Sequence, residues 1–202
     1  MKDRVLQRLL GEVAACRICA DHLPHGPRPV LQLDQRARIL IAGQAPGRRV
    51  HDTGVPFDDM SGDRLREWMG ISREAFYDPA LVAILPMGFC YPGSGRAGDL
   101  SPRPECADTW RAHLLERLRA VELTLVIGQY ALAWHLGNRE GGVTNAVRRW
   151  KDQWPRVLPL PHPSPRNRRW LTANPWFERE VVPALQRRVE QMTTGRAPTA
   201  TL

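Results

Sequence analysis

Four cysteines are the residues whose type and spacing predict chemistry most directly. Cys16 and Cys19 form a C-x2-C pair near the N-terminus, and Cys90 and Cys106 follow with fifteen residues between them. Thiolates at such spacings bind zinc or a [4Fe–4S] cluster, although a zinc ribbon normally brings a second C-x2-C pair. A third interpretation is that the four cysteines are buried separately and bind no metal. The spacing alone leaves the cluster, zinc and the unrelated cysteines equally open.

A loop rich in glycine and proline is the second feature with chemical meaning. It has the sequence Gly-Gln-Ala-Pro-Gly over Gly43–Gly47 and directly follows the apolar run Ile39–Ala42. This run is too short for a helix and indicates a buried parallel strand. Ligands bind at the carboxyl ends of such strands, and glycines let backbone N–H groups approach a ligand closely. The loop therefore predicts a ligand site, although a plain strand-to-loop turn has the same pattern.

His162 stands apart from the other five histidines. It lies between Pro161 and Pro163, directly after the apolar segment Arg156–Leu160. A residue between two prolines does not lie inside a helix, so the His162 ring can point into a cleft at the end of a strand. Two of the other histidines, His113 and His135, fall within predicted helices, where structural or solvated roles are expected.

The composition favours an acidic partner. There are 29 Lys and Arg residues against 21 Asp and Glu, which gives a net charge of +8, and only Lys2 and Lys151 are lysines. Arginine binds phosphate bidentately and stacks on bases, so the excess suits nucleic acid, although a GC-rich genome would give the same bias. No apolar run reaches the roughly 18 residues of a membrane span, and the N-terminus resembles no secretory signal. We expect a cytoplasmic protein with no membrane partner.

The elements that must position these residues alternate between helices and strands. The apolar periodicity predicts helices over Asp3–Ala15, Ser61–Met69, Pro104–Leu118, Tyr130–Leu136 and Pro175–Met192. Strands are predicted over Ile39–Ala42, Leu81–Leu85, Leu123–Ile127 and Arg156–Leu160. This order predicts an α/β fold, a three-layer αβα sandwich with a short four-stranded, mainly parallel sheet. We expect one domain over residues 1–192 and a flexible tail over residues 193–202.

Several of these motifs, taken together, resemble the uracil-DNA glycosylase superfamily. They are the loop Gly43–Gly47, the Gly-Val-Pro-Phe segment Gly54–Phe57 and the His-Pro-Ser-Pro segment His162–Pro165, in the order of that family. The cysteine spacing is similar to that of its bacterial and archaeal iron–sulfur branches, families 4 and 5. The resemblance runs from Cys16 to about Phe177. It implies a uracil-DNA glycosylase-like fold and a [4Fe–4S] cluster bound by Cys16, Cys19, Cys90 and Cys106.

The resemblance also implies roles for residues around a base that has been flipped out of DNA. Phe57 would lie under the base as the stacking surface. His162 would donate a hydrogen bond to O2 of the departing uracil, where negative charge develops. The pocket would be lined by Gly43, Gln44 and Ala45. Contacts to phosphate, or entry into the gap left by the base, would fall to Ser164, Arg166, Asn167 and Arg168.

The chain departs from these relatives in its first motif. Branches of the superfamily carry Asp or Glu there, whereas this chain has Gln44 and Ala45, and neither can act as a base. One iron–sulfur branch instead carries an acidic residue between the phenylalanine and a Ser-Gly pair. Asp59 is therefore the first candidate for the catalytic carboxylate, with Asp58 and Asp52 behind it, although each also suits a helix cap or a solvated surface.

A second departure concerns how the base is read. Several relatives carry an asparagine four residues before the third cysteine, where this chain has Pro86. We expect recognition to fall to the backbone at Met87, Gly88 and Phe89, or to an asparagine elsewhere, Asn145 or Asn167. The predicted substrate is DNA that contains uracil or another deaminated base, such as xanthine or hypoxanthine; a thymine-derived lesion is a further alternative.

These features predict a monofunctional DNA glycosylase that leaves an abasic site. No lysine occupies the motifs, so no Schiff base with the sugar is expected. The alternative is a protein of the same fold that binds damaged bases without turnover. We expect the chain to act as a monomer.

Overall fold

A four-stranded parallel sheet forms the centre of the computed structural model, which describes residues 3–96, 98–137 and 141–194. Its strands are β1 (Ile39–Ala42), β2 (Val82–Ile84), β5 (Leu123–Ile127) and β6 (Val157–Leu160). Their spatial order is β2-β1-β5-β6, and every neighbouring pair is parallel. The predicted sheet is confirmed, and β1 and β5 have the bounds expected from their apolar runs.

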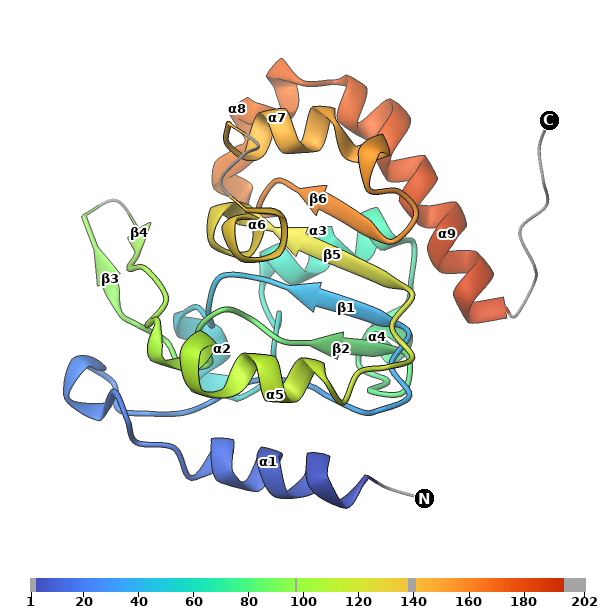
Figure 1. Cartoon of the computed structure of the whole chain (residues 1–202). Helices are drawn as coiled ribbons and strands as arrows, with labels where there is room; N and C mark the ends of the chain where they lie inside the picture. The colour runs from blue at the N-terminus through green and yellow to red at the C-terminus, as the bar shows by residue number, and fades with distance from the viewer. Residues whose placement is uncertain (1–2, 97, 138–140, 195–202) are drawn as a thin grey trace.

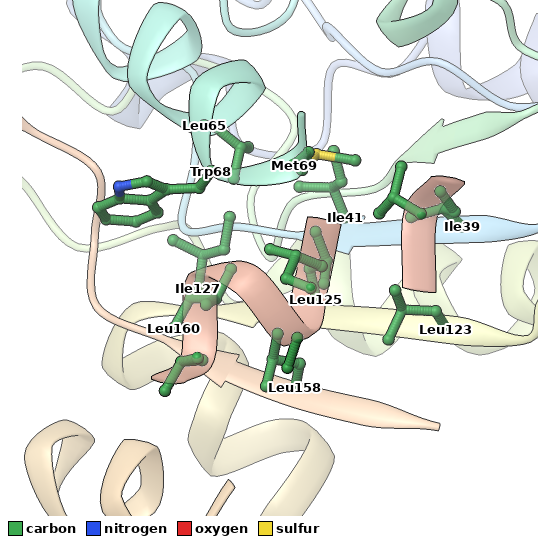
Figure 2. Packing of buried hydrophobic residues seen from close by; sticks show 14 of the residues in the cluster. Ile39, Ile41, Leu65, Trp68, Met69, Leu123, Leu125, Ile127, Leu158 and Leu160 are labelled. Atoms are coloured by element: carbon green, nitrogen blue, oxygen red, sulfur yellow. The ribbon is translucent and has the colours of Figure 1, made fainter. Parts of the chain in front are cut away.

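Helices cover both faces of this sheet, which explains why its strands are apolar on both sides. Ile39 and Ile41 pack on one face with α3 (Met60–Met69) and α9 (Val182–Thr194). Leu40 packs on the other face with α1 (Arg4–Ala14) and α5 (Ala112–Leu115). Figure 1 shows these layers, and Figure 2 shows side chains of β1, β5 and β6 meeting three residues of α3, Leu65, Trp68 and Met69. The expected three-layer αβα sandwich is confirmed.

Several short elements were not predicted. They are the helices α2 (Arg48–Thr53), α4 (Arg73–Phe76), α7 (Val143–Arg148) and α8 (Arg168–Ala173), and the hairpin β3 (Ser94–Gly95) with β4 (Gly98–Asp99). Single-turn 3-10 helices span Ala20–His22, Trp150–Asp152 and Pro165–Asn167. The hairpin lies inside the segment 90–106, whose Gly, Pro and Ser content is typical of a loop.

The predicted helices differ from the observed ones mainly at their ends. The two longest predictions each open with a π-helical turn, Ala107–Arg111 before α5 and Phe177–Val181 before α9. Helix α6 (Gly128–Leu136) begins directly at the end of β5. Helix α9 runs to Thr194, two residues into the expected tail, and the rest of that tail, residues 195–202, lies outside the described residues. Within the described ranges no helix combines the length and apolarity that crossing a bilayer requires.

All four strands point the same way, so their carboxyl ends meet at one edge of the sheet. Helix α2 and the hairpin β3–β4 lie beside this edge, on the left of Figure 1. The loop Gly43–Gly47 connects β1 to α2, and the segment after β6 begins with Pro161 and His162. The fold therefore gathers the sequence motifs where parallel sheets bind their ligands.

Candidate active site

A cavity of about 320 Å³ lies at the carboxyl edge of the sheet. This volume is at the lower end of the roughly 300–1,000 Å³ typical of small-ligand sites. Several separate stretches of sequence line it. The predicted residues among its walls are Gly43, Gln44, Ala45, Phe57, Asp59, His162, Ser164 and Arg166. The structure thus brings together the first-motif loop, the Phe57 segment and the His162 segment.

The first-motif loop is fixed to the segment that follows β2. The carbonyls of Gly43 and Gln44 accept hydrogen bonds from the N–H groups of Met87 and Gly88, both at 2.9 Å. The Phe89 N–H donates to the Cys106 sulfur at 3.4 Å. This differs from the prediction that Met87 and Gly88 contact the base, because their N–H groups are engaged within the protein and neither residue lines the cavity.

Phe57 is held in a strained backbone conformation at the cavity wall. Its φ of 54° is the only positive value at a non-glycine residue within the described ranges, and a bulky residue there costs energy that surrounding contacts must offset. Arg66 donates to the Phe57 carbonyl at 3.4 Å. The ring meets Phe76 edge-on, with centroids 6.1 Å apart. These contacts hold the aromatic face beside the Gly43 end of the first-motif loop.

Gly62 is packed against Phe57 so closely that no side chain fits. A Cβ added at Gly62 would lie 1.8 Å from the Phe57 carbonyl oxygen. We expect Gly62→Ala to lower the free energy of unfolding by roughly 2–4 kcal/mol, because Phe57 must move. Chemical denaturation measures this loss. Gly11→Ala is the control, since it adds a methyl in α1 with nothing within 4 Å and is expected to stabilise by about 0.5–1 kcal/mol. Equal effects of the two changes would contradict this account of Phe57.

His162 presents one ring nitrogen to the cavity as a hydrogen-bond donor. Its Nδ1 accepts from the Ser164 N–H at 3.2 Å, and its carbonyl accepts from the Asn167 side-chain amide at 2.7 Å. Burial lowers the pKa of His162, and the Asp59 and Asp99 carboxylates only partly oppose this. The imidazole is therefore neutral at neutral pH. Because Nδ1 is an acceptor, we assign the proton to Nε2.

Only one of the three predicted carboxylates reaches the cavity. Asp59 lines it, and its Oδ1 caps α3 by accepting from the Gly62 N–H at 2.9 Å. Asp58 lies outside the lining and pairs with Arg73 at 2.8 Å, and this hydrogen bond holds the pKa of Asp58 below its usual value. Asp52 also lies outside the lining, exposed on α2 beside Arg48. This cap also sets the start of α3 at Met60, one residue before the predicted start at Ser61.

Asp99 is a cavity residue that was not predicted. It ends β4, lines the cavity, and accepts a hydrogen bond from the Ser94 hydroxyl at 2.9 Å. In the sequence it stands among Gly, Pro and Ser residues with no pattern that points to a site. Only the hairpin brings it to the first-motif loop.

The residues after His162 form the rim of the cavity. The Ser164 hydroxyl accepts from the Arg166 N–H at 3.2 Å and so caps the turn Pro165–Asn167. Arg166 lines both the cavity and a neighbouring hollow whose walls include Arg168 and Arg169. These exposed guanidinium groups suit a phosphate backbone. The Asn167 amide supports the His162 carbonyl, so its entry into DNA stays a prediction.

The four cysteines lie near one another, outside the cavity. All are free thiols, and Cys19 and Cys90 pack together with Leu23. Burial, together with the neighbouring Cys106, Cys19 and Cys16, raises the pKa of Cys90 to about 12. Within the described ranges no three His, Cys, Asp or Glu side chains converge closely enough for one metal ion. A [4Fe–4S] cluster is held by four cysteine thiolates, so the four-thiol donor set fits such a cluster.

A buried arginine supports the strand end beside Pro86. Arg111 is fully buried and donates to the carbonyls of Leu85 and Pro86, at 2.5 and 2.8 Å, and to Nε2 of His135 at 2.7 Å. Burial lowers the pKa of Arg111 to about 10. Burial and then the Arg111 charge lower the pKa of His135 to about 3, so His135 is a neutral acceptor.

The lowered pKa of His135 predicts a pH dependence of stability. Below pH 6.5, the ordinary pKa of histidine, His135 is protonated in the unfolded chain. In the folded chain it stays neutral down to about pH 3. The free energy of unfolding should therefore fall with decreasing pH, by about 1.4 kcal/mol per pH unit from this proton. His135→Gln, which keeps an acceptor, should remove that slope in chemical denaturation, and the exposed His113→Gln should keep it. An unchanged slope in His135→Gln would contradict the burial of a neutral histidine.

Comparison with protein families identifies the chain. Residues 31–186, most of the sequence, match the family model described as the uracil DNA glycosylase superfamily. The chain belongs to this superfamily. The resemblance of the three motifs is thereby confirmed, together with the fold that it implied.

Relatives within the superfamily match along most of their length. The chain is 26% identical over 171 residues to a protein of Thermotoga maritima named type-4 uracil-DNA glycosylase. The aligned region covers 81% of this chain and 83% of the relative. It is 25% identical over 173 residues to a protein of the same name from Archaeoglobus fulgidus, covering 79% of this chain and 81% of the relative. These names agree with the predicted iron–sulfur branch of the superfamily, family 4.

Proposed function

We propose that this chain is a DNA repair glycosylase that hydrolyses the N-glycosidic bond of uracil in DNA and leaves an abasic site. The observation that carries the proposal is the cavity where Phe57, the first-motif loop and a neutral His162 meet. Its membership of the superfamily, and the names of its relatives, support uracil as the base.

The cavity suits a base that has left the duplex. Extrusion costs a few kcal/mol, which stacking and hydrogen bonds in the pocket must offset. Phe57 supplies an aromatic face on a strained backbone, and the first-motif loop supplies a backbone wall beside it. The Gln44 amide donates to the Leu100 carbonyl at 3.1 Å, so this wall is tied to the hairpin.

His162 acts as an electrostatic catalyst in this mechanism. As the bond between C1′ of the sugar and N1 of uracil breaks, negative charge develops on the carbonyl oxygen O2. The Nε2–H of the neutral imidazole donates a hydrogen bond to that oxygen, and the Ser164 N–H on Nδ1 holds the required tautomer. Asp59 places a carboxylate at the cavity, where it stabilises positive charge on the sugar.

The reaction is hydrolysis without strand cleavage. The chain has two lysines, Lys2 and Lys151, and Lys151 lies in the turn Trp150–Asp152, outside the cavity lining. No amine among the described lining residues can therefore form a Schiff base with the sugar. Duplex binding falls to the rim residues Ser164, Arg166 and Arg168, and the net charge of +8 adds long-range attraction.

We infer a [4Fe–4S] cluster held by Cys16, Cys19, Cys90 and Cys106. When bound, it supplies a structural crosslink between the segment after α1 and the segment 90–106 that carries the hairpin. The Cys19 and Cys90 thiols already share one buried cluster with Leu23, which supports this assignment.

Base release from a panel of duplexes tests the proposed function. Labelled duplexes with a single uracil, hypoxanthine, xanthine or thymine opposite guanine are incubated with the protein, then heated in alkali to cleave abasic sites. The uracil duplex should be cleaved fastest, and only after alkali. Binding of the uracil duplex without any alkali-labile product would instead favour a damage-binding protein of the same fold, an alternative motivated by Ala45 and Pro86.

A further inference from the structure

The first-motif loop of this chain lacks a carboxylate, and the hairpin β3–β4 brings one to the same place. Asp99 lines the cavity together with Gly43, Gln44, Ala45 and Gly47. A Cβ built on Gly47 would lie 3.5 Å from the Asp99 Oδ2. The Asp99 carboxylate therefore lies within van der Waals reach of the first-motif loop.

The carboxylate is oriented by its neighbours. Its Oδ1 accepts from the Ser94 hydroxyl at 2.9 Å, and that hydroxyl is itself 2.6 Å from the Tyr91 hydroxyl. This chain of hydrogen bonds occupies one oxygen. The other oxygen, Oδ2, lies on the side of Gly47 and the first-motif loop. Asp99 is exposed at the mouth of the cavity, so water reaches it before DNA binds.

The hairpin itself is held between two walls of the cavity. On one side the Gln44 amide donates to the Leu100 carbonyl at 3.1 Å. On the other side the Arg166 guanidinium lies so close to Gly98 that an added Cβ would be 2.6 Å from it. Asp99 stands between these two contacts in the sequence. Its position is thus set by both the first-motif loop and the segment after His162.

Asp59 differs from Asp99 in its hydrogen-bond partner. One Asp59 oxygen caps α3, a helix whose N-terminus favours a fixed negative charge. That environment suits a carboxylate that remains ionised beside a cationic sugar. Asp99 caps no helix, because its hydrogen-bonded partner is the Ser94 hydroxyl and α2, which begins after Gly47, has no side-chain cap. This leaves Oδ2, beside the first-motif loop, to take a proton from water.

We propose that Asp99 is the catalytic carboxylate that activates the water nucleophile, an assignment that rests on the proposed glycosylase function. Asp99 accepts a proton from water while the water oxygen forms a bond to C1′. The bond from C1′ to N1 of uracil breaks, and its electron pair leaves with the base, whose O2 is hydrogen-bonded to His162. The proton held on Asp99 then passes through solvent to the uracil anion.

Asp99→Asn tests this role with little structural change. Asparagine keeps an oxygen that accepts from Ser94, but it cannot take a proton. We expect the single-turnover rate of uracil release to fall about 10²–10⁴-fold, with the Kd for uracil-containing DNA and the unfolding midpoint unchanged. Asp99→Glu should recover part of the rate. Asp78→Asn is the matched control, because Asp78 is an exposed aspartate outside the cavity whose Oδ1 likewise accepts one hydrogen bond, from the Ala80 N–H.

The pH profile separates a base from a merely structural residue. With wild type, log rate should fall on the acid side with a slope of about one as a carboxylate protonates, and Asp99→Asn should lose that limb. If Asp99→Asn kept the wild-type rate, or lost DNA binding as much as rate, the role of Asp99 would be overturned. Base release by wild type would leave the glycosylase function intact in either case. No base release by wild type from any duplex would overturn both.

Discussion

Replacing His162 with alanine is expected to lower kcat for uracil release about 10²–10³-fold, the effect of deleting one preorganised donor to a developing anion. Affinity for uracil-containing DNA should change little, because Nε2 of His162 interacts most strongly when the base carries charge in the transition state. Single-turnover kinetics and a binding titration on the same duplex measure the two quantities. His113→Ala is the control, since His113 is exposed on α5, away from the cavity.

The protonation state of His162 gives this prediction a second readout. Burial lowers the pKa of His162 below its ordinary value of 6.5, so the folded protein holds the neutral ring at neutral pH. The wild-type rate should therefore not decline as the pH is raised from about 6 to about 8. A rate that fell tenfold per pH unit over that range would mean that the imidazolium is the active form, which would contradict the assignment of a neutral donor.

Replacing Cys90 with alanine is expected to abolish binding of the [4Fe–4S] cluster and to leave most of the chain unfolded or insoluble. Cys90 is 7% exposed and belongs to the segment that carries the hairpin and Asp99. Loss of one of four thiolates removes a crosslink that no other described cysteine can replace, since the chain has four cysteines in all. Iron and sulfide per chain and the yield of folded protein measure the outcome.

Leu23→Ala separates the cluster from simple packing. Leu23 is buried with Cys19 and Cys90 but has no metal-binding atom. Its truncation should lower stability by about 2–4 kcal/mol while iron and sulfide stay at four each per chain. If Cys90→Ala were soluble and as stable as Leu23→Ala, with the wild-type iron content, the cluster assignment would be refuted.

The sheet and its edge were predictable because their signals are local. Ile39–Ala42 is an unbroken apolar run and Leu123–Ile127 is interrupted only by Thr124; each is followed by a glycine, and both strands have those bounds. The six-residue helices α2 and α8 were missed, because they are too short to show an apolar period and lie in arginine-rich sequence. Helix α3 begins at Met60, one residue before the predicted start at Ser61, because the Asp59 carboxylate caps it.

The candidate site was predictable to the extent that its residues sit in motifs. The loop Gly43–Gly47, Phe57 and His162 each follow or flank a recognisable strand end, so their convergence follows from parallel topology. The bonds of the Met87 and Gly88 N–H groups to the first-motif loop were not predictable, because they join segments far apart in the sequence. Asp99 was missed because a two-residue strand carries no pattern, and only the folded hairpin brings it beside Gly47.

The identity of the released base is the most direct test of the function. A duplex with one labelled uracil opposite guanine is incubated with excess wild-type protein that carries its cluster, and the small-molecule fraction is analysed by mass spectrometry. We predict free uracil in an amount equal to the duplex, with the DNA strand intact until alkali is added. A duplex that is bound but retains its uracil would contradict the assignment of this chain as a uracil-releasing enzyme.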